Sequence, residues 1–286
     1  MLRATVFILA CQTAKAEDPL GSYNTSAGSA HTRQLATLAN EDILESSGLA
    51  ISIRTPQLFW THNDSGDRAR LFAFDADGRH RGVVSLADVI ATDWEDIASF
   101  RRNDGGWLLV ADVGDNGQRR ETCVLHLLPE PDPRTLVASV HSSITFRYEG
   151  GPIDCESVGI DVTSNLVLLA SKSVFGSRVY ALLLPTTPMG QISVAQLIAT
   201  IPVPLATALD ISPDGRRAIV LTYTDAYEFQ RDEDESWAAA FKRPPVVISM
   251  PIRRQGESVC YGPDGRSLFL TSERTPTPLW FVERSP

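Results

Sequence analysis

One short pattern recurs five times along the chain and constrains its fold more than any other feature of the sequence. Each copy begins with a small or acidic polar residue, has an apolar residue two positions later and continues as a short strand-like run. The copies begin 48, 61, 51 and 50 residues apart. Self-similarity at a period of this size is typical of propellers and related repeat folds. The five starting residues are Ser47, Glu95, Glu156, Thr207 and Glu257.

Each copy is followed by further strand-like runs that are separated by turns. After the first copy these runs are 58–60, 71–74 and 82–86, with Asp-Gly or similar hairpin punctuation between many of the runs in the chain. The last two copies share a Pro-Asp-Gly turn at one offset, at 213–215 and 263–265, which fixes the register of the repeat. Four antiparallel strands in a period of about 50 residues are typical of a propeller blade. The sequence therefore predicts an all-β, five-bladed β-propeller with four antiparallel strands per blade.

The last repeat lacks one strand, and an unassigned strand lies upstream of the first repeat. Three strand-like runs remain after Glu257, at 258–262, 267–270 and 279–282, before the chain ends. The upstream candidate covers 33–38. We expect this N-terminal strand to close the last blade as its outer strand, because pairing would remove an open sheet edge.

One stretch has the pattern of a helix rather than a strand. Within 232–243, Trp237 and Phe241 are four residues apart and would share one face of a helix. We expect this helix in the connection between the third and fourth strands of the fourth blade.

The beginning of the chain has the features of a targeting segment. Arg3 gives a basic start, residues 4–10 are apolar, and Ala14-Lys15-Ala16 has the small-x-small pattern of a cleavage site. Cys11 makes a lipoprotein signal, with a lipid anchor on that cysteine, the alternative. An unstructured cytosolic tail is the third reading. We expect export, which would make the protein secreted or periplasmic.

Composition limits the remaining organisation of the chain and its partners. We expect a signal over 1–16, a flexible linker over 17–32 and a single propeller domain over 33–286. No later run is long and apolar enough to span a bilayer. The net charge of −9 and a pI near 5.1 argue against nucleic acid and anionic membranes as partners. We expect a monomer that takes a small-molecule or phosphorylated ligand.

The five starting residues form the strongest candidate site. The first strand of each blade lines the central channel of a propeller, so these side chains should meet at one mouth of the channel. Two carboxylates about 5 Å apart repel each other by about 3 kcal/mol at an effective dielectric of about 20, and a cation removes that cost. Calcium accepts 6–8 oxygen ligands, whereas an all-oxygen set without His or Cys argues against zinc and copper. The sequence therefore predicts Ca²⁺ held by Ser47, Glu95, Glu156, Thr207 and Glu257; the alternative is that the glutamates cap strands or pair with arginines.

The loops between the second and third strands of the blades should open on the same face, which we name the ring face. Aspartates there could orient water as a base, and polar side chains could bind a ligand. The candidate catalytic residues are His62, Asp64, Asp112 and Asp115, and the candidate ligand-binding residues are Asn63, Asn116, Lys172, Asp225 and Arg274. The loop 112–117 has a simpler reading as a turn, because Asp-Asn-Gly strings favour turns.

Three sequence segments resemble known families. Ser47-Gly48-Leu49, the strand 58–64 and Trp94-Glu95-Asp96-Ile97 resemble secreted bacterial propellers of the SdiA-regulated and esterase-like-phytase families, over about residues 45–285. That resemblance implies calcium binding. The order Ser, Glu, Glu, Thr, Glu is similar to the Ser-Glu-Glu-Ser-Glu calcium shell of five-bladed, apyrase-type calcium-activated nucleotidases. The chain departs from the nucleotidases at His62-Asn63, where that family has an Asp-Asp pair.

These observations leave two classes of function open. We expect an exported calcium-binding propeller that binds a ligand or partner on its ring face. The alternative is a calcium-dependent hydrolase, acting either on phosphoesters as a nucleotidase or on carbonyl compounds as a lactonase-like esterase. The sequence has no Gly-x-Ser-x-Gly elbow of a serine hydrolase, and no Gly-rich phosphate loop or dinucleotide fingerprint.

Overall fold

A computed structural model of the protein describes residues 31–185 and 190–284. The predicted signal over 1–16, its alternative lipid anchor at Cys11 and most of the predicted linker over 17–32 lie outside the described residues. Nearly all of the regular secondary structure in the described residues is β-strand. None of the helices found in these ranges is long and apolar enough to cross a membrane.

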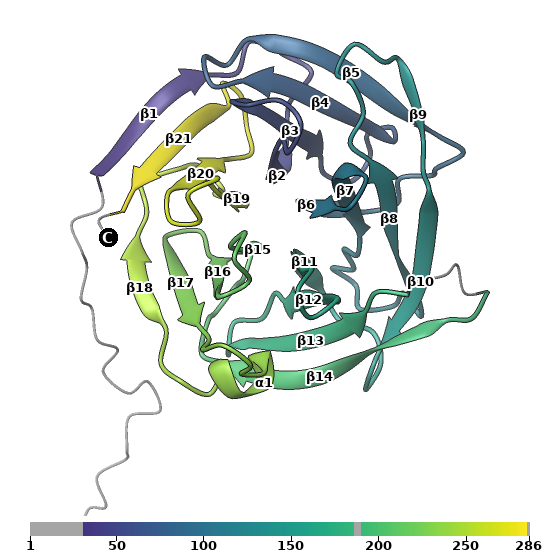
Figure 1. Cartoon of the computed structure of the whole chain (residues 1–286), viewed down its shortest axis with the longest axis vertical. Coiled ribbons are helices and arrows are strands. Elements are labelled where there is room, and N and C mark those ends of the chain that lie inside the picture. Colours follow the sequence, from purple (N-terminus) through teal and green to yellow (C-terminus); the bar gives the residue numbers. More distant parts are fainter. Residues whose placement is uncertain (1–30, 186–189, 285–286) are drawn as a thin grey trace, which may run out of the picture.

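The strands that begin the five sequence repeats lie nearest the central axis (Figure 1). Each of them contacts the next one along the chain, and the last contacts the first, so they close a ring. Nearly all of their residues are buried, which fits strands that have neighbours on both faces. These inner strands are β2 (Ser46–Ile51), β6 (Trp94–Arg102), β11 (Cys155–Asp161), β15 (Ala208–Ile211) and β19 (Ser258–Tyr261).

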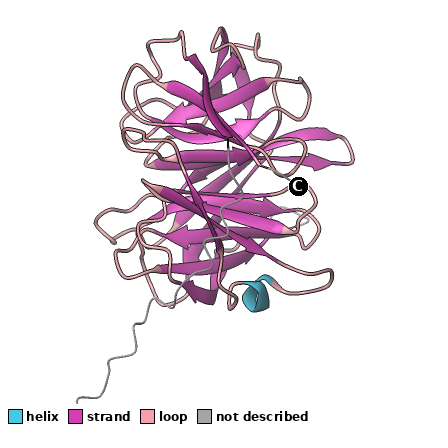
Figure 2. Cartoon of the chain, turned by 90° about the vertical axis from the view of Figure 1, so that its left-hand side faces the viewer, coloured by secondary structure: helices cyan, strands magenta, loops and turns pink. Residues whose placement is uncertain are grey.

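Antiparallel strands follow each inner strand toward the outside of the ring. After β2 come β3 (Leu58–Asn63), β4 (Arg70–Asp75) and β5 (His80–Ala87), and after β6 come β7 (Gly105–Asp112), β8 (Cys123–Pro129) and β10 (Ser142–Tyr148). After β11 come β12 (Leu166–Ser171), β13 (Ser177–Leu183) and β14 (Ser193–Ile201). After β15 come β16 (Arg217–Leu221), β17 (Asp225–Gln230) and β18 (Val246–Ser249), and after β19 come β20 (Leu268–Thr271) and β21 (Pro278–Glu283). In side view, loops connect these strands at both faces of the ring (Figure 2).

The N-terminal strand β1 (His31–Thr37) completes the last group of strands. It pairs antiparallel with β21, from His31 opposite Glu283 to Thr37 opposite Pro278. This pairing confirms the predicted outer position of the N-terminal strand, which begins two residues earlier than the predicted range 33–38. The first and last strands of the described chain are thereby joined by hydrogen bonds.

The hydrogen-bonded sheets differ from a simple set of separate four-stranded blades. The outer strands β10 and β14 pair in parallel, which joins two groups of four strands into one eight-stranded sheet. A short extra strand, β9 (Val137–Ser139), pairs in parallel with β5 and makes a five-stranded sheet. The described strands therefore form four sheets, of four, eight, four and five strands. The repeat pattern of the sequence does not predict these outer parallel contacts.

The predicted helix over 232–243 is wrong in its extent, because α1 covers only Trp237–Ala240. Asp234 has a left-handed backbone with φ of 62°, which interrupts a helix at that point. The Ser236 side chain then caps α1 by accepting a hydrogen bond from the backbone N–H of Ala239. The Pro pair at 244–245 lies four residues after Ala240 and disfavours a longer helix.

Buried carboxylates join neighbouring inner strands. Asp96 on β6 accepts hydrogen bonds from the backbone N–H groups of Val158 at 2.8 Å and Leu209 at 3.3 Å. Asp210 on β15 accepts a hydrogen bond from the N–H of Tyr261 on β19 at 2.7 Å. These contacts cross-link the inner strands around the axis.

Candidate metal centre

Three carboxylates gather where β3 ends and β6 begins. Glu95 is the second residue of β6, Asp93 lies two residues upstream, and Asp64 directly follows β3. One oxygen from each of them lies within 4.8 Å of the others, a spacing that allows all three to hold one metal ion. The set contains only oxygen atoms, which are the ligands that hard divalent cations prefer. We name this group of three residues the acidic cluster.

The loop after β7 supports Asp93. The Asp112 carboxylate accepts hydrogen bonds from the backbone N–H groups of Thr92 at 2.9 Å and Asp93 at 3.2 Å. In return, the carbonyl oxygen of Asp93 accepts from the N–H of Val113 and the N–H of Gly114, each at 3.1 Å. The backbone of Asp93, directly before β6, is therefore fixed by contacts with the end of β7 and the loop after it.

Gly114 has no side chain, and carboxylates of the acidic cluster occupy the space where a side chain would lie. A Cβ atom at this position would lie 2.2 Å from Oε1 of Glu95 and 2.5 Å from Cγ of Asp93. Real Cβ atoms do not approach other heavy atoms so closely. Any larger residue at 114 would therefore displace two of the three cluster carboxylates.

Electrostatic repulsion and burial oppose full ionisation of the acidic cluster. Burial, reinforced by the charges of Glu156 and Asp64, raises the pKa of Glu95 well above its usual range. Burial and the nearby Asp64 raise the pKa of Asp93 to about 6, and burial also raises the pKa of Asp64. Two full charges 4.8 Å apart repel by about 3.5 kcal/mol at an effective dielectric of about 20. The cluster must therefore hold protons or a cation.

Glu156 and Glu257 lie beside the cluster, and each has a partner of its own. The Lys172 ammonium donates a hydrogen bond to Oε1 of Glu156 at 2.7 Å and lies 2.5 Å from its Oε2. The hydroxyl of Tyr223 donates to Oε1 of Glu257 at 3.1 Å, and Lys172 lies 5.3 Å from the centre of the Tyr223 ring. Burial raises the pKa of Glu156 to about 8, although Lys172 opposes this rise. Lys172 thus supplies one positive charge to an otherwise acidic mouth.

Glu273 was absent from the predicted ligand set, yet it belongs to this mouth. Burial and a hydrogen bond with Glu257 raise the pKa of Glu273 to about 9. The Gln255 side chain donates to its Oε2 at 2.7 Å. Asp93 was missed as well, although it stands only two residues before a predicted ligand. Glu273 lies on the loop between β20 and β21, which opens on the ring face.

The two predicted hydroxyl ligands are buried at the starts of their strands. Ser47 Oγ donates to the carbonyl oxygen of Glu95 at 2.9 Å and lies 3.4 Å from its Oε2, so this side chain adjoins the cluster. Thr207 Oγ1 donates to the carbonyl oxygen of Gly256 at 2.9 Å. The structure therefore brings Ser47 and Glu95 together, whereas Thr207 is bound to the backbone just before Glu257.

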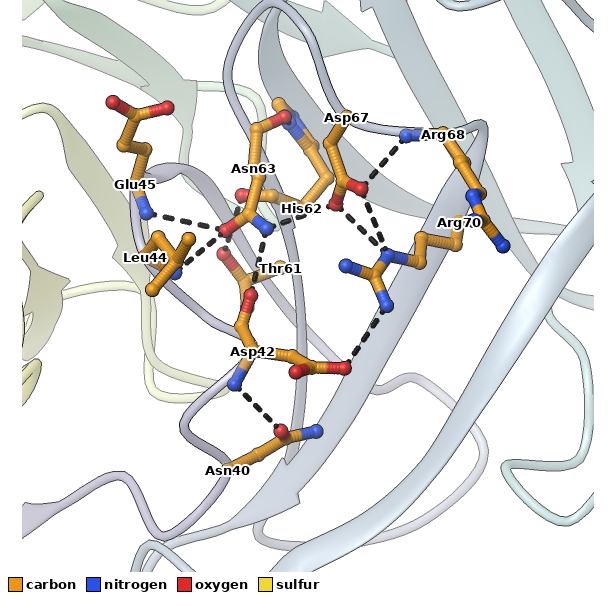
Figure 3. A network of polar contacts seen from close by, with 10 residues as sticks. All are labelled: Asn40, Asp42, Leu44, Glu45, Thr61, His62, Asn63, Asp67, Arg68 and Arg70. Atoms are coloured by element: carbon orange, nitrogen blue, oxygen red, sulfur yellow. Dashed lines mark hydrogen bonds and ion pairs between the residues drawn. The ribbon is translucent and has the colours of Figure 1, made fainter.

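Asn63 is fully occupied by contacts with the connection between β1 and β2 (Figure 3). Its Oδ1 accepts from the N–H groups of Leu44 at 3.0 Å and Glu45 at 3.2 Å. Its Nδ2 donates to the carbonyl oxygen of Asp42 and to Oδ2 of Asp67, each at 2.8 Å. These four hydrogen bonds leave no free group for a ligand, and we infer that Asn63 has a structural role.

His62 is enclosed within the protein rather than facing the cluster. Its Nδ1 lies 3.0 Å from the carbonyl oxygen of Asn63, and its ring packs edge-on to Trp94 with 5.6 Å between centroids. Nε2 has no hydrogen-bond partner among the described residues, and a Cβ at position 48 would lie 2.7 Å from it. Burial lowers the pKa of His62 to about 4, which keeps the ring neutral. We infer that His62 packs β3 against β6.

Asp112 and Asp115 hold Arg120 in the loop that was predicted to carry catalysis. The guanidinium of Arg120 lies 2.7 Å from Oδ1 of Asp112, and its backbone N–H donates to Oδ2 of Asp115 at 2.7 Å. Arg120 also donates to the carbonyl oxygen of Gly114 at 2.8 Å. These contacts favour the alternative reading of the loop as a turn. The turn adjoins the acidic cluster through Gly114.

The remaining predicted ligand-binding residues make local contacts on the ring face. Asp225 accepts a hydrogen bond from the side chain of the preceding Thr224 at 2.9 Å. The Arg274 side chain donates to that of Gln255, and Asn116 is exposed.

Comparison with known proteins identifies the fold. No protein-family model matches the sequence, and no curated protein matches it. Among solved structures, a gluconolactonase from Xanthomonas campestris matches with a TM-score of 0.53 at 12% identity, over 91% of each chain. The soluble aldose sugar dehydrogenase from Escherichia coli, in its apo form, matches with a TM-score of 0.50 at 10% identity, over 90% of this chain and 100% of the other. Both neighbours are β-propeller enzymes.

These similarities show that the chain has an all-β, propeller-like fold. The identities are too low to carry a reaction or a ligand from either neighbour to this chain. The resemblance to the SdiA-regulated and esterase-like-phytase families, and that to the nucleotidases, therefore stays a prediction.

Proposed function

We propose that Asp64, Asp93 and Glu95 hold one Ca²⁺ ion, and that the protein uses it to hydrolyse an uncharged ester or lactone. The observation that carries this proposal is the gathering of three carboxylate oxygens within 4.8 Å of one another. A second supporting observation is the raised pKa of all three groups, which results first from burial. A bound cation would remove the cost of ionising these groups together.

The chain offers further oxygen ligands that suit calcium better than magnesium. The Ser47 hydroxyl adjoins Glu95, and the carboxylates of Glu156, Glu257 and Glu273 lie at the same mouth. Calcium takes 6–8 oxygen ligands in flexible geometry and retains some water, whereas magnesium demands a tighter octahedron. We therefore expect Ca²⁺ to bind more tightly than Mg²⁺.

The proposed chemistry assigns different tasks to the residues of the mouth. A bound calcium ion would polarise a carbonyl oxygen and acidify a water molecule. Asp93 is the candidate acceptor for a proton from that water, because its pKa of about 6 leaves it ionised near neutral pH while making it a stronger base than an ordinary aspartate. Glu156 holds Lys172 in place by an ion pair at 2.5 Å, so that its ammonium stays at the rim of the mouth.

Charge favours an uncharged substrate over a phosphoester. The two basic groups that support the mouth are already paired, Arg120 with Asp112 and Lys172 with Glu156. The surrounding carboxylates would repel a phosphate group, and the charges of Arg120 and Lys172 are already offset by their own partners. An ester or a lactone avoids this cost because it brings no negative charge to the site.

We infer further that the chain has five blades and is exported. The blade count is supported by the five inner strands, each of which begins one sequence repeat. The parallel contact between β10 and β14 then joins two blades at their outer edges rather than making a larger blade. Export is supported by the basic and apolar start of the sequence.

A calcium-stabilised binding module is the second candidate. The near-complete burial of Glu95, Glu156 and Glu257 favours it, because an ion enclosed by protein can serve to fasten blades together. Such a module would need calcium for stability but would release no product from an ester.

Two glycine variants test the proposed function with a matched control. Gly114→Ala would push its new methyl group into Glu95 and Asp93, whereas the nearest atom to a Cβ at Gly117 in the same loop is 3.6 Å away. We expect chelator-treated wild type and Gly117→Ala to hydrolyse 4-nitrophenyl acetate and γ-butyrolactone when calcium is restored. We expect Gly114→Ala to lose at least tenfold in kcat/KM at the same calcium concentration.

Other outcomes would reject parts of the proposal. Calcium-dependent stability without hydrolysis would support the binding module. Calcium-dependent release of phosphate from a nucleoside diphosphate, without ester hydrolysis, would instead support the nucleotidase. Hydrolysis that is equal in the presence of chelator and of calcium would show that the cluster is not the reactive centre.

A further inference from the structure

A cavity of about 300 Å³ lies at the end of the channel opposite the acidic mouth. All five inner strands contribute to its wall near their last residues. One layer of the wall is formed by the residues four positions after the start of each sequence repeat: Ile51, Ser99, Ile160, Ile211 and Tyr261. The volume is at the lower end of the range in which proteins hold small ligands.

Buried apolar residues separate this cavity from the acidic cluster along the channel. They stand two positions after the start of each repeat, and none of them is more than 2% exposed: Leu49, Ile97, Val158, Leu209 and Val259. The cavity is therefore a site distinct from the proposed metal centre.

Asp210 is a carboxyl group of the cavity wall that has no basic partner. Its Oδ1 accepts a hydrogen bond from the N–H of Ile211 at 2.8 Å, and its Oδ2 accepts one from the N–H of Tyr261 at 2.7 Å. An ionised carboxylate has about four lone-pair sites, so each oxygen can accept a further hydrogen bond. The other carboxylate of the wall, Asp161, pairs with Arg231 at 2.8 Å. No basic side chain among the described residues pairs with Asp210 in this way, and burial raises its pKa to about 7.

The repeat does not require an acid at the position of Asp210. The equivalent residues of the other four copies are all uncharged: Ala50, Ala98, Gly159 and Cys260. The inner strands of those copies form without a carboxyl group there, so the fold alone does not explain Asp210. A second buried carboxyl group, that of Asp96, accepts a hydrogen bond from the N–H of Leu209 at 3.3 Å and adds negative charge beside Asp210. Both acids would be stabilised in their ionised form by a cation in the cavity.

Arg101 is the basic residue of the cavity wall, and it is exposed to solvent. It stands six positions after the start of its repeat, so it lies nearer the rim than Ser99 does. Water screens an exposed charge, so Arg101 should affect a ligand in the cavity less than the enclosed Asp210 does. Much of the remaining wall is apolar and includes Phe100 beside the isoleucines. This wall suits a ligand with an apolar body and one cationic group.

We propose that the cavity binds a small organic ammonium ion, whose N–H groups donate to Asp210 while its apolar body lies against Ile51, Ile160 and Ile211. The site is additional to the proposed metal centre and requires no hydrolysis. An anionic ligand would be repelled by Asp210, and a neutral one would leave its charge unpaired.

Three ligands that share a phenyl ring and a short linker test the charge preference of the cavity. They are 2-phenylethylammonium, 2-phenylethanol and phenylacetate, each titrated into the full chain by calorimetry at about pH 8, above the pKa of Asp210. We expect the ammonium ion to bind at least tenfold more tightly than the alcohol, because a hydrogen bond to a charged group adds to the same apolar contact. Asp210→Asn should remove this difference. Asp232→Asn is the matched control, because Asp232 is exposed at the same end of the ring but does not line the cavity.

A second variant tests the cavity without altering Asp210. Val162 lines the cavity and is 42% exposed, so an indole in its place can fill the opening without displacing the core. We expect Val162→Trp to weaken binding of both the ammonium ion and the alcohol at least tenfold. Val174→Trp is the control, because Val174 is 65% exposed and does not line the cavity.

The inference stands or falls separately from the metal centre. The affinity for 2-phenylethylammonium should be the same with calcium as with chelator, because the acidic cluster lies at the other end of the channel. Tighter binding of phenylacetate than of the ammonium ion would identify an anion site instead and would overturn the inference. Equal ammonium affinity in wild type and Asp210→Asn, or the absence of any heat of binding with millimolar ammonium ion, would overturn it as well.

Discussion

Asp93 and Gly114 show how far the metal centre depends on single residues that carry no repeat signature. Asp93 supplies one of the three carboxylates, and Gly114 supplies the space between two of them. Both are held by the same backbone contacts between the β5–β6 connection and the loop after β7. The centre is therefore a product of two neighbouring loops rather than of the inner strands alone.

Asp93→Asn should weaken calcium binding by at least tenfold, because it removes one of three charged ligands while keeping the side-chain shape. Asp115→Asn is the control, since the Asp115 carboxylate accepts a hydrogen bond from the Arg120 N–H and has no place in the cluster. Calorimetric titration of chelator-treated protein measures both affinities. Equal calcium affinities in the two variants would remove Asp93 from the ligand set.

Asp210 predicts a pH dependence of stability that is independent of the metal centre. Burial raises its pKa from 3.8 to about 7 in the folded protein. Between about pH 4 and 7 the folded state therefore holds a proton that the unfolded state has released, so the free energy of unfolding should fall as the pH rises through this window. We expect Asp210→Asn to make the free energy of unfolding, measured by urea denaturation at several pH values, depend less on pH. The change should correspond to the loss of up to one bound proton. An identical slope in wild type and variant would contradict the assignment.

At the scale of elements, the sequence repeat predicted the inner strands well because their pattern has a local cause. A residue that starts each inner strand must be polar where the channel opens, and the next residues must be apolar where the strand is covered on both faces. The outer contacts were not predictable in the same way. The pairing of β10 with β14 and of β9 with β5 depends on how neighbouring groups of strands meet, and no periodicity in either segment records it.

The helix was predicted longer than it is, whereas the outer strand contacts were not predicted at all. The spacing of Trp237 and Phe241 correctly placed them on one face, where Phe241 packs on Phe229 with 4.9 Å between ring centroids. The left-handed backbone at Asp234 is a turn feature that the apolar spacing does not report. The spacing of the two aromatic residues therefore identified the buried face of the helix. Its length is set by the turn at Asp234 and the cap at Ser236.

Removal of β1 tests the closure of the ring by the N-terminal strand. A chain that begins at residue 38 would expose the backbone edge of β21, which β1 covers from His31 to Thr37 with one irregularity between Gln34 and Ala36. At about 1 kcal/mol for each lost hydrogen bond, we expect a fall in Tm of about 10 °C. The comparator is the chain that begins at His31, so that only β1 differs between the two. Equal Tm values would show that β1 does not stabilise the ring.

At the scale of the whole molecule, the sequence predicted that the repeat glutamates meet at one mouth of the channel, but not which loop residues lie beside them there. The repeat predicted that Glu95, Glu156 and Glu257 lie at one mouth, because the first strands of all blades line the channel and begin at the same end of it. It could not show that Lys172 pairs with Glu156, nor that His62 turns into the protein beside Trp94. Side-chain partners on different loops are set by tertiary contacts, which leave little trace in a single sequence.

The distribution of charge and apolar surface gives the molecule two unlike faces. The ring face combines the acidic mouth with the most exposed apolar side chains, whereas the channel ends on the opposite side in a cavity of about 300 Å³ that Ile51, Ile160 and Tyr261 help to line. The acidic charge of the ring face is the property on which the proposal of an uncharged substrate depends.

Calcium binding by the chelator-treated protein, followed by calorimetry and by Tm in the same samples, tests the central claim most directly. The account predicts one tight site, tighter for calcium than for magnesium, and a stabilisation of about 2.7 kcal/mol when calcium reaches a hundred times its Kd. It also predicts that Gly114→Ala loses both signals while Gly117→Ala keeps them. If wild type shows no heat of binding and the same Tm with millimolar calcium as with chelator, the three carboxylates do not form a metal centre and the account is contradicted.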